Sequence, residues 1–370
     1  MEMANIQLQE SIVLWASFLI CVLFGAIAQR THFCTMGAIS DIYNISSWVR
    51  MRMWGMAIGV AMIGFYFLAW QGWIDPTKTI YYSGQVLWLS ALVGGGLFGF
   101  GMVLASGCAS KTLVRIGEGS LKSIVVFIIM GLAAFASMRG LTAFLRAQTV
   151  DRFSFPVEAG GNLPAWLSKT LGLNPGMTAL LIVLSIGGGL IFWAVSNHKF
   201  RSSANNLLAG FGIGAVIVMI WWVIGHLGFV QEHPLTLEST YLSTPSGRIQ
   251  ALSFTGPMAR TIDWVIFFEP AKKIPLAVML ITGVILGSYL HALYSRTFQW
   301  EGFQSTQDTA LHIVGAALMG IGGVTAAGCT VGQGLSGIST LSMTSFIALT
   351  GIMLGGIMGL RFQMWLLMRE

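Results

Sequence analysis

Charged side chains are scarce in this chain. Only 9% of its residues are Asp, Glu, Lys or Arg, whereas 55% are hydrophobic and the mean hydropathy is +0.75. A soluble domain carries roughly 25% charged residues, and a soluble core of this size could not hide so much apolar surface. The composition therefore excludes an ordinary soluble protein and predicts a membrane protein.

Three further absences narrow the function. No Asp or Glu lies in the middle of any long apolar run, which argues against a carboxylate-lined cation path. No ATP-binding loop of the Gly-x-x-x-x-Gly-Lys-Ser/Thr type is present, so a primary pump would need a partner chain. The cysteines lie at spacings that match no zinc or iron–sulfur pattern, so we expect neither a metal nor another cofactor.

Apolar runs of about 20 residues, the length that crosses a hydrocarbon layer, occur nine times. They lie near residues 11–29, 53–70, 86–106, 122–143, 176–195, 207–228, 274–294, 310–328 and 344–367. We therefore expect an all-α polytopic membrane protein with about nine transmembrane helices. Glu2 and Glu10 precede the first run where a signal peptide would carry positive charge, so we interpret that run as a retained span.

Basic residues gather in alternate connections, and connections rich in Lys and Arg stay on the cytoplasmic side. Those that define the pattern are Arg30, Arg50, Arg52, Lys111, Arg115, Lys122, Lys199, Arg201 and Arg296. The pattern predicts an N-terminus outside and a C-terminus in the cytoplasm, and it accounts for the net charge of +6 without a nucleic acid. Two long outer connections, about 140–174 and 229–273, are expected to cap the outer face, with a substrate-receiving vestibule as the alternative.

Two glycine-dotted segments match each other across more than half of the chain. Residues 99–108 and 320–329 both end in Gly-Cys, and aligning Cys108 with Cys329 also pairs Gly107 with Gly328. With the orientation above, the two segments run in opposite directions, which is typical of the inverted repeats of transporters. We predict a single membrane domain, 1–370, with halves at about 11–145 and 205–368 joined by 146–204, which adds one span.

The residues around each Gly-Cys are unusually small and polar for a membrane interior. A glycine before such a stretch indicates a broken helix whose free backbone groups face a cavity. Exposed N–H groups at helix N-termini suit a small oxyanion. A third thiol, Cys34, precedes another run of small residues, whereas Cys21 lies in an apolar run as a small hydrophobe. The candidate path residues are Cys34, Cys108, Cys329, Gly107, Gly328, Lys111, Thr330 and Gln333.

Three segments together resemble the YeeE/YedE sulfur-transport family. They are Phe33-Cys34 after Arg30, the Ala-x-Gly-Cys-x-x-x-Thr-x-x-Arg-x-Gly-x-Gly run over 105–119, and Ala-Gly-Cys-Thr-Val-Gly-Gln-Gly-Leu over 327–335. The resemblance implies a permease of the bacterial inner membrane that takes up a small sulfur-containing anion, most often thiosulfate. It also implies short re-entrant helices, an hourglass of two opposed funnels, and relay of the anion by the S–H groups of Cys34, Cys108 and Cys329 at the central constriction. A soluble sulfur-carrier or sulfurtransferase protein often accompanies such a permease.

Several alternatives remain open at the level of sequence. Lys111 stands where thiosulfate importers carry small or hydroxyl residues, so it either attracts an anion or anchors the inner interface, and the substrate could be another sulfur or selenium species. A membrane sulfurtransferase or redox enzyme would instead form a cysteine persulfide, for which Lys111 and Arg115 would have to stabilise the thiolate of Cys108. We favour the permease over the enzyme. The direction of flow, the energy source and the oligomeric state are not encoded in any of these patterns.

Overall fold

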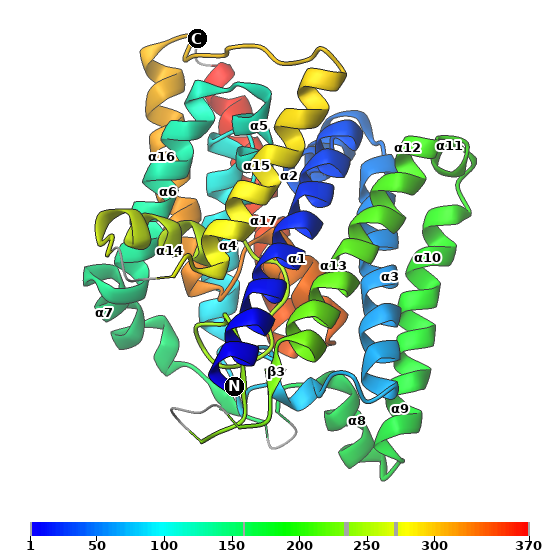
Figure 1. Cartoon of the computed structure of the whole chain (residues 1–370). Helices are drawn as coiled ribbons and strands as arrows, with labels where there is room; N and C mark the ends of the chain where they lie inside the picture. Colours follow the sequence, from blue (N-terminus) through cyan, green and yellow to red (C-terminus); the bar gives the residue numbers. More distant parts are fainter. Residues whose placement is uncertain (1, 158–159, 233–236, 270–272, 369–370) are drawn as a thin grey trace.

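The computed structural model describes residues 2–157, 160–232, 237–269 and 273–368, and it is built of helices that pack side by side (Figure 1). Within these ranges nine helical segments are long and apolar enough to cross a membrane, which confirms the number expected. They are Asn5–Ile45, Val49–Trp70, Trp88–Glu118, Leu121–Arg139, Pro175–Val195, Ala204–Leu227, Leu276–Tyr294, Thr306–Thr325 and Met343–Leu367. The two termini lie at opposite ends of the molecule, as an odd number of crossings requires (Figure 1).

Two spans are longer than expected because each contains a break followed by a second, shorter helix. The first consists of α1 (Glu2–Thr31) and α2 (Thr35–Ile45), and the third of α4 (Trp88–Leu104) and α5 (Ala109–Glu118). Five other long helices are unbroken. They are α3 (Val49–Trp70), α6 (Leu121–Arg139), α15 (Leu276–Tyr294), α16 (Thr306–Thr325) and α17 (Met343–Leu367).

The fifth and sixth spans are helices interrupted by π turns. The fifth comprises α9 (Pro175–Ile182), the π turn η3 (Val183–Gly187) and α10 (Gly188–Val195), and α11 (His198–Arg201) leads to the sixth. The sixth comprises α12 (Ala204–Leu207), η4 (Leu208–Gly212), α13 (Ile213–Trp222) and η5 (Val223–Leu227). One further π segment, η6 (Gly332–Gly337), follows the break after α16.

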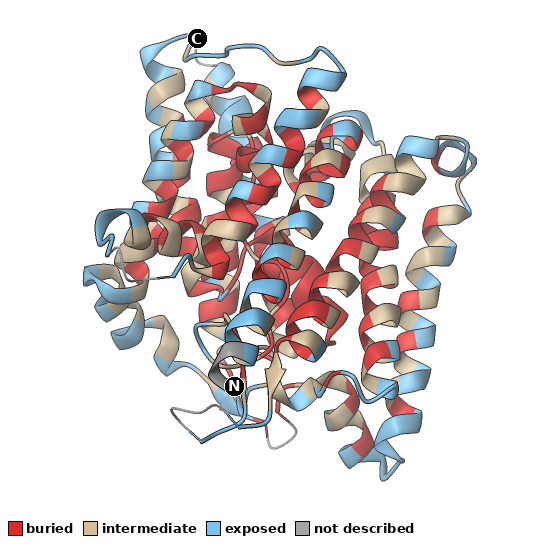
Figure 2. Ribbon diagram, in the orientation of Figure 1, coloured by how far each residue is buried: buried red, intermediate tan, exposed pale blue. Residues whose placement is uncertain are grey.

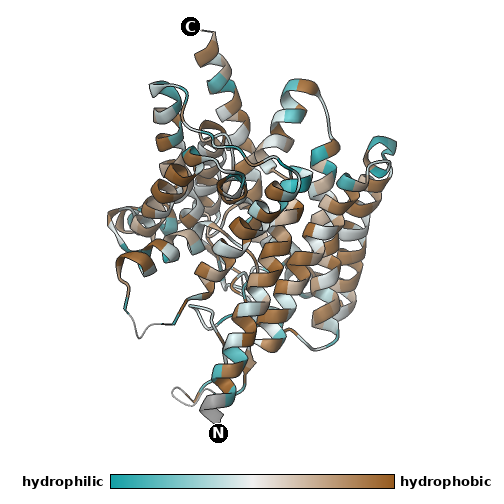
Figure 3. Ribbon diagram, turned by 45° about the horizontal axis from the view of Figure 1, so that its top comes forward, coloured by the Kyte–Doolittle hydropathy of each residue, from teal (hydrophilic) through white to brown (hydrophobic). Residues whose placement is uncertain are grey.

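Apolar side chains cover the outward faces of the helices. On α1 the exposed residues Leu8, Ile12, Trp15, Leu19 and Leu23 recur every three or four positions, which places them on one face. Such a stripe would be costly in water but suits lipid. Buried residues gather where helices face one another (Figure 2), and hydrophilic residues gather near helix ends and in the connections (Figure 3).

Helices α4 and α16, which end at the two matched Gly-Cys turns, pack directly on each other through glycine. A Cβ on Gly101 would lie 2.6 Å from the carbonyl oxygen of Gly315, and a Cβ on Gly315 would lie 2.6 Å from that of Gly101. A Cβ on Gly322 would lie 2.6 Å from the carbonyl oxygen of Gly94. Since Gly94 faces Gly322 while Gly101 faces Gly315, the helices run antiparallel, as an inverted repeat predicts for its matched segments.

The two long connections fold into short elements. The first contains α7 (Leu141–Gln148), the 3₁₀ turn η2 (Val150–Arg152) and α8 (Leu163–Leu171), and its strand β2 (Phe155–Pro156) pairs antiparallel with β1 (Gln85–Val86). The second contains the antiparallel pair β3 (Phe229–Val230) and β4 (Thr240–Tyr241), and then α14 (Thr255–Ile266). A 3₁₀ turn, η1 (Pro76–Lys78), lies between α3 and β1.

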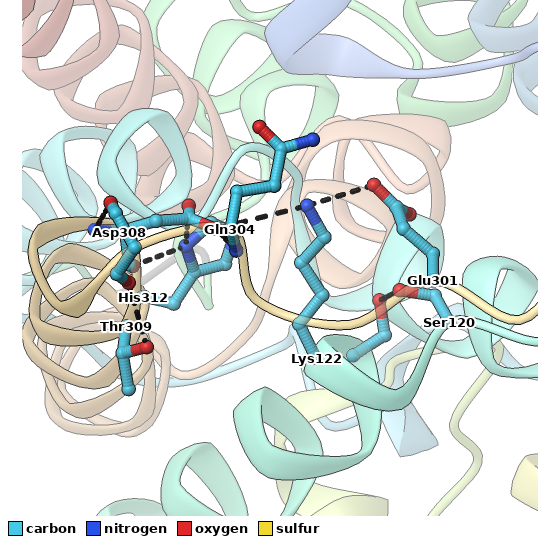
Figure 4. A network of polar contacts seen from close by, with 9 residues as sticks. Ser120, Lys122, Glu301, Gln304, Asp308, Thr309 and His312 are labelled. Carbon is cyan, nitrogen blue, oxygen red and sulfur yellow. Dashed lines mark hydrogen bonds and ion pairs between the residues drawn. The ribbon is translucent and has the colours of Figure 1, made fainter.

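A polar network ties the start of α6 to the start of α16 (Figure 4). The Nζ atom of Lys122 lies 2.8 Å from Oε1 of Glu301 and 3.9 Å from Oδ2 of Asp308. His312 is buried, with Nδ1 2.9 Å from Oδ1 of Asp308. Ser305 caps α16 by accepting a hydrogen bond of 3.1 Å from the backbone N–H of Asp308. The connection between α15 and α16 is therefore held against α6 by charge.

Candidate functional site

Each of the three candidate thiols follows a helix that ends in the same way. The residue two positions before the cysteine has a positive φ, of 51° at His32, 55° at Ser106 and 55° at Ala327. The next residue donates its backbone N–H to the carbonyl five positions back. These bonds are Phe33 to Ala28 (3.2 Å), Gly107 to Met102 (2.8 Å) and Gly328 to Gly323 (2.8 Å). Such closures are Schellman motifs, and positive φ at residues other than glycine is uncommon.

Each cysteine then begins the next helix. Cys34 and Cys108 are extended N-cap residues of α2 and α5, and their carbonyls accept the first helical bonds, from Ala38 (3.0 Å) and Thr112 (2.9 Å). The carbonyl of Cys329 likewise accepts a bond of 2.8 Å from Gln333. The first N–H groups of a helix have no partner within it and carry partial positive charge. Each thiol therefore lies beside a set of backbone donors.

The structure brings Cys34, Cys108 and Thr330 together from three different spans. All three are buried, and the side chain of Cys108 interacts with those of Cys34 and Thr330. The Cys108 sulfur also lies 3.3 Å from Oγ of Ser110. Apart from its contact with the Cys108 thiol, the buried hydroxyl of Thr330 has no polar partner among the described residues. Because Thr330 adjoins Cys329 in sequence, the two Gly-Cys turns meet at one place.

Cys329 is completely buried and is held by residues that the sequence analysis did not single out. Its sulfur accepts hydrogen bonds from the backbone N–H groups of Phe254 (3.3 Å) and Gly332 (3.4 Å), and Oγ of Ser253 lies 3.9 Å away. Phe254 is the N-cap of α14, so a fourth helix N-terminus points at this group of thiols. The only sequence signal for it is Pro257 in the first turn of α14, since proline is favoured at helix starts.

A long side chain folds back over the glycine of each turn and leaves little room for a Cβ there. A Cβ on Gly107 would lie 3.3 Å from Cγ of Lys111, and a Cβ on Gly328 would lie 3.0 Å from Cγ of Gln333. Lys111 is three residues after its cysteine, whereas Gln333 is four residues after its own. Each of the two side chains reaches back over the glycine that precedes its cysteine.

Both the nitrogen and the oxygen of the Gln333 side-chain amide form hydrogen bonds within the protein. Its Nε2 donates to the carbonyl of Ala326 at 2.7 Å, and its Oε1 accepts from the hydroxyl of Ser345 at 2.5 Å. The side chain is buried. It therefore braces the turn that carries Cys329 and Thr330.

Lys111 belongs to a cluster of charges near Cys34 and Cys108, at the end of α4. Its Nζ lies 3.5 Å from Oε1 of Glu118, and both side chains are largely shielded. Arg50 pairs with Asp41 at 3.4 Å, and its guanidinium covers Gly37, where a Cβ would lie 2.6 Å away. His32 lies within electrostatic range of this cluster. Glu118 therefore balances the charge of Lys111 within this cluster.

A cavity of about 490 Å³ lies next to the turn that precedes Cys329. The second long connection lines most of it, from Ser243 to Trp264, and its inner end reaches Ser253 and Gly328. Tyr81 also lines it and donates a hydrogen bond of 2.6 Å to the carbonyl of Gly332. Burial raises the pKa of Tyr81 far above its ordinary value, so it remains a neutral donor. The second long connection, which we expected to cap the outer face, also forms a wall of this cavity.

Comparison with known proteins agrees with this arrangement. The profile of a family described as sulphur transport matches residues 30–358, which include all three thiols and the cavity walls. This chain belongs to the sulphur transport family. The resemblance to YeeE/YedE proteins found in the sequence is thereby confirmed.

Two relatives in this family align over almost their whole length. The thiosulfate transporter TsuA of Spirochaeta thermophila is 28% identical over 353 residues, which cover 93% of this chain and 97% of that protein. The thiosulfate transporter TsuA of Escherichia coli is 28% identical over 354 residues, 92% of each chain. A shorter match, 29% over 98 residues, joins the chain to the probable transporter YedE of Escherichia coli.

Proposed function

We propose that this member of the sulphur transport family is an uptake permease for thiosulfate. The observation that carries the proposal is the meeting of Cys34, Cys108 and the Cys329–Thr330 turn, each at a helix N-terminus, in a buried site beside a cavity. A dianion that leaves water must find hydrogen-bond donors at every position. Helix N-termini supply N–H donors without a permanent countercharge that would trap the ion.

The contacts suggest the order of the steps. The anion enters the cavity, reaches Ser253 and Cys329, and passes Thr330 to Cys108 and Cys34. It leaves through the charged cluster around Lys111. Thiols donate weak hydrogen bonds through a soft sulfur, so each can hold the anion without binding it so tightly that it stops, as conduction requires.

We infer that this relay needs no covalent step. In the enzymatic alternative, a cysteine thiolate attacks the outer sulfur of thiosulfate, a persulfide forms on the protein and sulfite leaves. Turnover with thiosulfate labelled in its outer sulfur separates the two mechanisms. The relay predicts that Cys108 carries no label when the purified protein is trapped with an alkylating reagent. Stoichiometric label on Cys108 would establish the enzyme.

A growth experiment tests the permease. A bacterium that lacks its own sulfate and thiosulfate importers is supplied with thiosulfate as its sole sulfur source. We expect the native chain and Cys21→Ala to restore growth and Cys108→Ala to fail at equal protein level. Cys21 is the matched control because it is equally buried but packs against Gly283 of α15, away from the other thiols. Failure of the native chain in the membrane would instead point to another sulfur or selenium species.

We propose that the chain lies in the bacterial inner membrane with its N-terminus outside and its C-terminus in the cytoplasm. The basic residues support this orientation. Lys111 and Lys122 lie close to the junction of the third and fourth spans and Arg201 lies between the fifth and sixth, and these two junctions are on the same side of the membrane. A C-terminal fluorescent fusion should be bright and a C-terminal alkaline phosphatase fusion inactive. The reverse result would invert the direction of the path.

We further propose that residues 11–145 and 205–368 are inverted halves. The antiparallel contact of α4 with α16 and the matching turns at Cys108 and Cys329 support this division. A soluble sulfur acceptor at the inner face also remains a proposal. Four basic residues, Arg50, Arg52, Lys122 and Arg201, offer a surface for an acidic partner. Arg50 pairs with Asp41, Arg52 stacks on Trp193 and Lys122 pairs with Glu301, whereas Arg201 is exposed.

A further inference from the structure

The cavity beside Cys329 is larger than a small anion needs. A water molecule takes up about 30 Å³ in the liquid, so 490 Å³ can hold an oxyanion together with several waters. Its walls run from the exposed residues Pro245 and Ser246 to Ala327 and Gly328 at the turn before Cys329. An anion can therefore stop in this space before it meets the thiols.

One face of α14 forms a wall of the cavity. Gly256, Arg260 and Trp264 all line it and are spaced by four residues, so they follow one another along the same helix face. On the opposite face Met258 is completely buried. The absence of a side chain at Gly256 leaves the space between Arg260 and Ser253 open.

Three hydrogen-bond donors of this cavity have no partner among the described residues. The indole Nε1 of Trp264 and the hydroxyl of Ser243 are buried polar atoms without a hydrogen bond. The guanidinium of Arg260 likewise makes no hydrogen bond or ion pair there. Buried donors are nearly always satisfied, and an orphan group needs an explanation.

The charges around Arg260 are of both signs, and Asp263 lines the cavity with it. Burial is the main cause that lowers the pKa of the Arg260 guanidinium, and Arg139 lowers it further, whereas Asp263 opposes this. Arginine still keeps its proton at physiological pH. Lys273 stands at the cavity wall but is already paired with Glu10 of α1. Arg260 is thus a half-buried cation that a bound anion would stabilise.

We propose that Arg260, Trp264 and Ser243 form an outer receiving site for a sulfur oxyanion, separate from the three thiols. This inference rests on the proposed function, because it takes the cavity as the entrance to the path. The guanidinium binds two oxygens of the anion, and the indole and hydroxyl groups bind the others. The site collects the anion from dilute solution and releases it past Gly256 to Ser253 and Cys329.

Equilibrium binding of labelled thiosulfate to the purified full chain tests this site without requiring transport. We expect Arg260→Gln to raise the dissociation constant by about tenfold, the lower end for a charge-assisted hydrogen bond. Arg260→Lys should keep part of the affinity. Trp264→Phe keeps an aromatic ring but removes the indole N–H, so it should weaken thiosulfate binding several-fold. This variant tests the same site if the Arg260→Gln protein cannot be purified.

Arg152→Gln is the matched control, because Arg152 is an exposed arginine of the other long connection and does not line the cavity. The Arg152→Gln protein should bind thiosulfate with the affinity of the native chain. In the Cys108→Ala background, adding Arg260→Gln should still weaken binding. Native affinity in both Arg260→Gln and Trp264→Phe, or no binding by the native chain, would overturn the receiving site. If the native chain takes up thiosulfate but Arg260→Gln binds it with native affinity, only the receiving site is refuted. If binding depends on Arg260 but the native chain takes up no thiosulfate, only the permease is refuted.

Discussion

At the scale of single residues, the candidate side chains differ in how many hydrogen bonds and ion pairs they make within the protein. The buried hydroxyl of Thr330 has no polar partner among the described residues apart from the Cys108 thiol, whereas both ends of the Gln333 amide are hydrogen-bonded to the protein. Lys111 is engaged as well, because its charge is paired with Glu118. The sequence alone could not show these differences, since all three residues follow a Gly-Cys.

Lys111→Met should reduce the maximal rate of thiosulfate uptake because it leaves Glu118 unpaired beside the path of an anion. We expect a loss of about fivefold, equivalent to about 1 kcal/mol. The double variant Lys111→Met/Glu118→Gln should recover most of the rate, since it removes the repelling charge too. A double variant as slow as the single one would mean that Lys111 itself holds the substrate.

At the scale of elements, the contact between α4 and α16 depends on glycine. Gly101→Ala would place its Cβ 2.6 Å from the carbonyl of Gly315, so the helices must separate. Overpacking of this kind costs about 1–3 kcal/mol, and we expect thermal unfolding in detergent to begin at least ~2 °C lower. Gly96→Ala on the same helix is the control, because a Cβ there meets nothing within 4 Å. Equal losses in both variants would contradict close packing as the reason for Gly101.

The link between α6 and the connection before α16 should depend on pH (Figure 4). The hydrogen bond from Lys122 lowers the pKa of Glu301 below its ordinary value of 4.5. A lowered carboxyl pKa contributes stability that is present above the ordinary value and lost as pH falls through the folded value. The difference in unfolding temperature between the native chain and Lys122→Met should thus be present at neutral pH and shrink on acidification. A difference that stays constant with pH would exclude this pair as its source.

At the scale of the whole molecule, the sequence is sufficient for the number of spans and for the direction of the matched segments. Both follow from local patterns, the apolar runs and the Gly-Cys repeat. The contacts around Cys329 could not be found in this way, because Phe254 lies 75 residues from it and carries no distinctive side-chain chemistry at that contact, which uses only its backbone N–H. Arg260 was equally hidden, since an arginine in a long connection looks like any other surface charge until α14 places it in a cavity.

The most direct test of the path is uptake of labelled thiosulfate by proteoliposomes that contain only the purified chain. The account predicts uptake by the native chain and by Cys21→Ala, and a loss of about tenfold or more, the scale of one lost donor to a charged group, in Cys34→Ala, Cys108→Ala and Cys329→Ala. Uptake at the native rate by all three of these variants would contradict a path through the thiols.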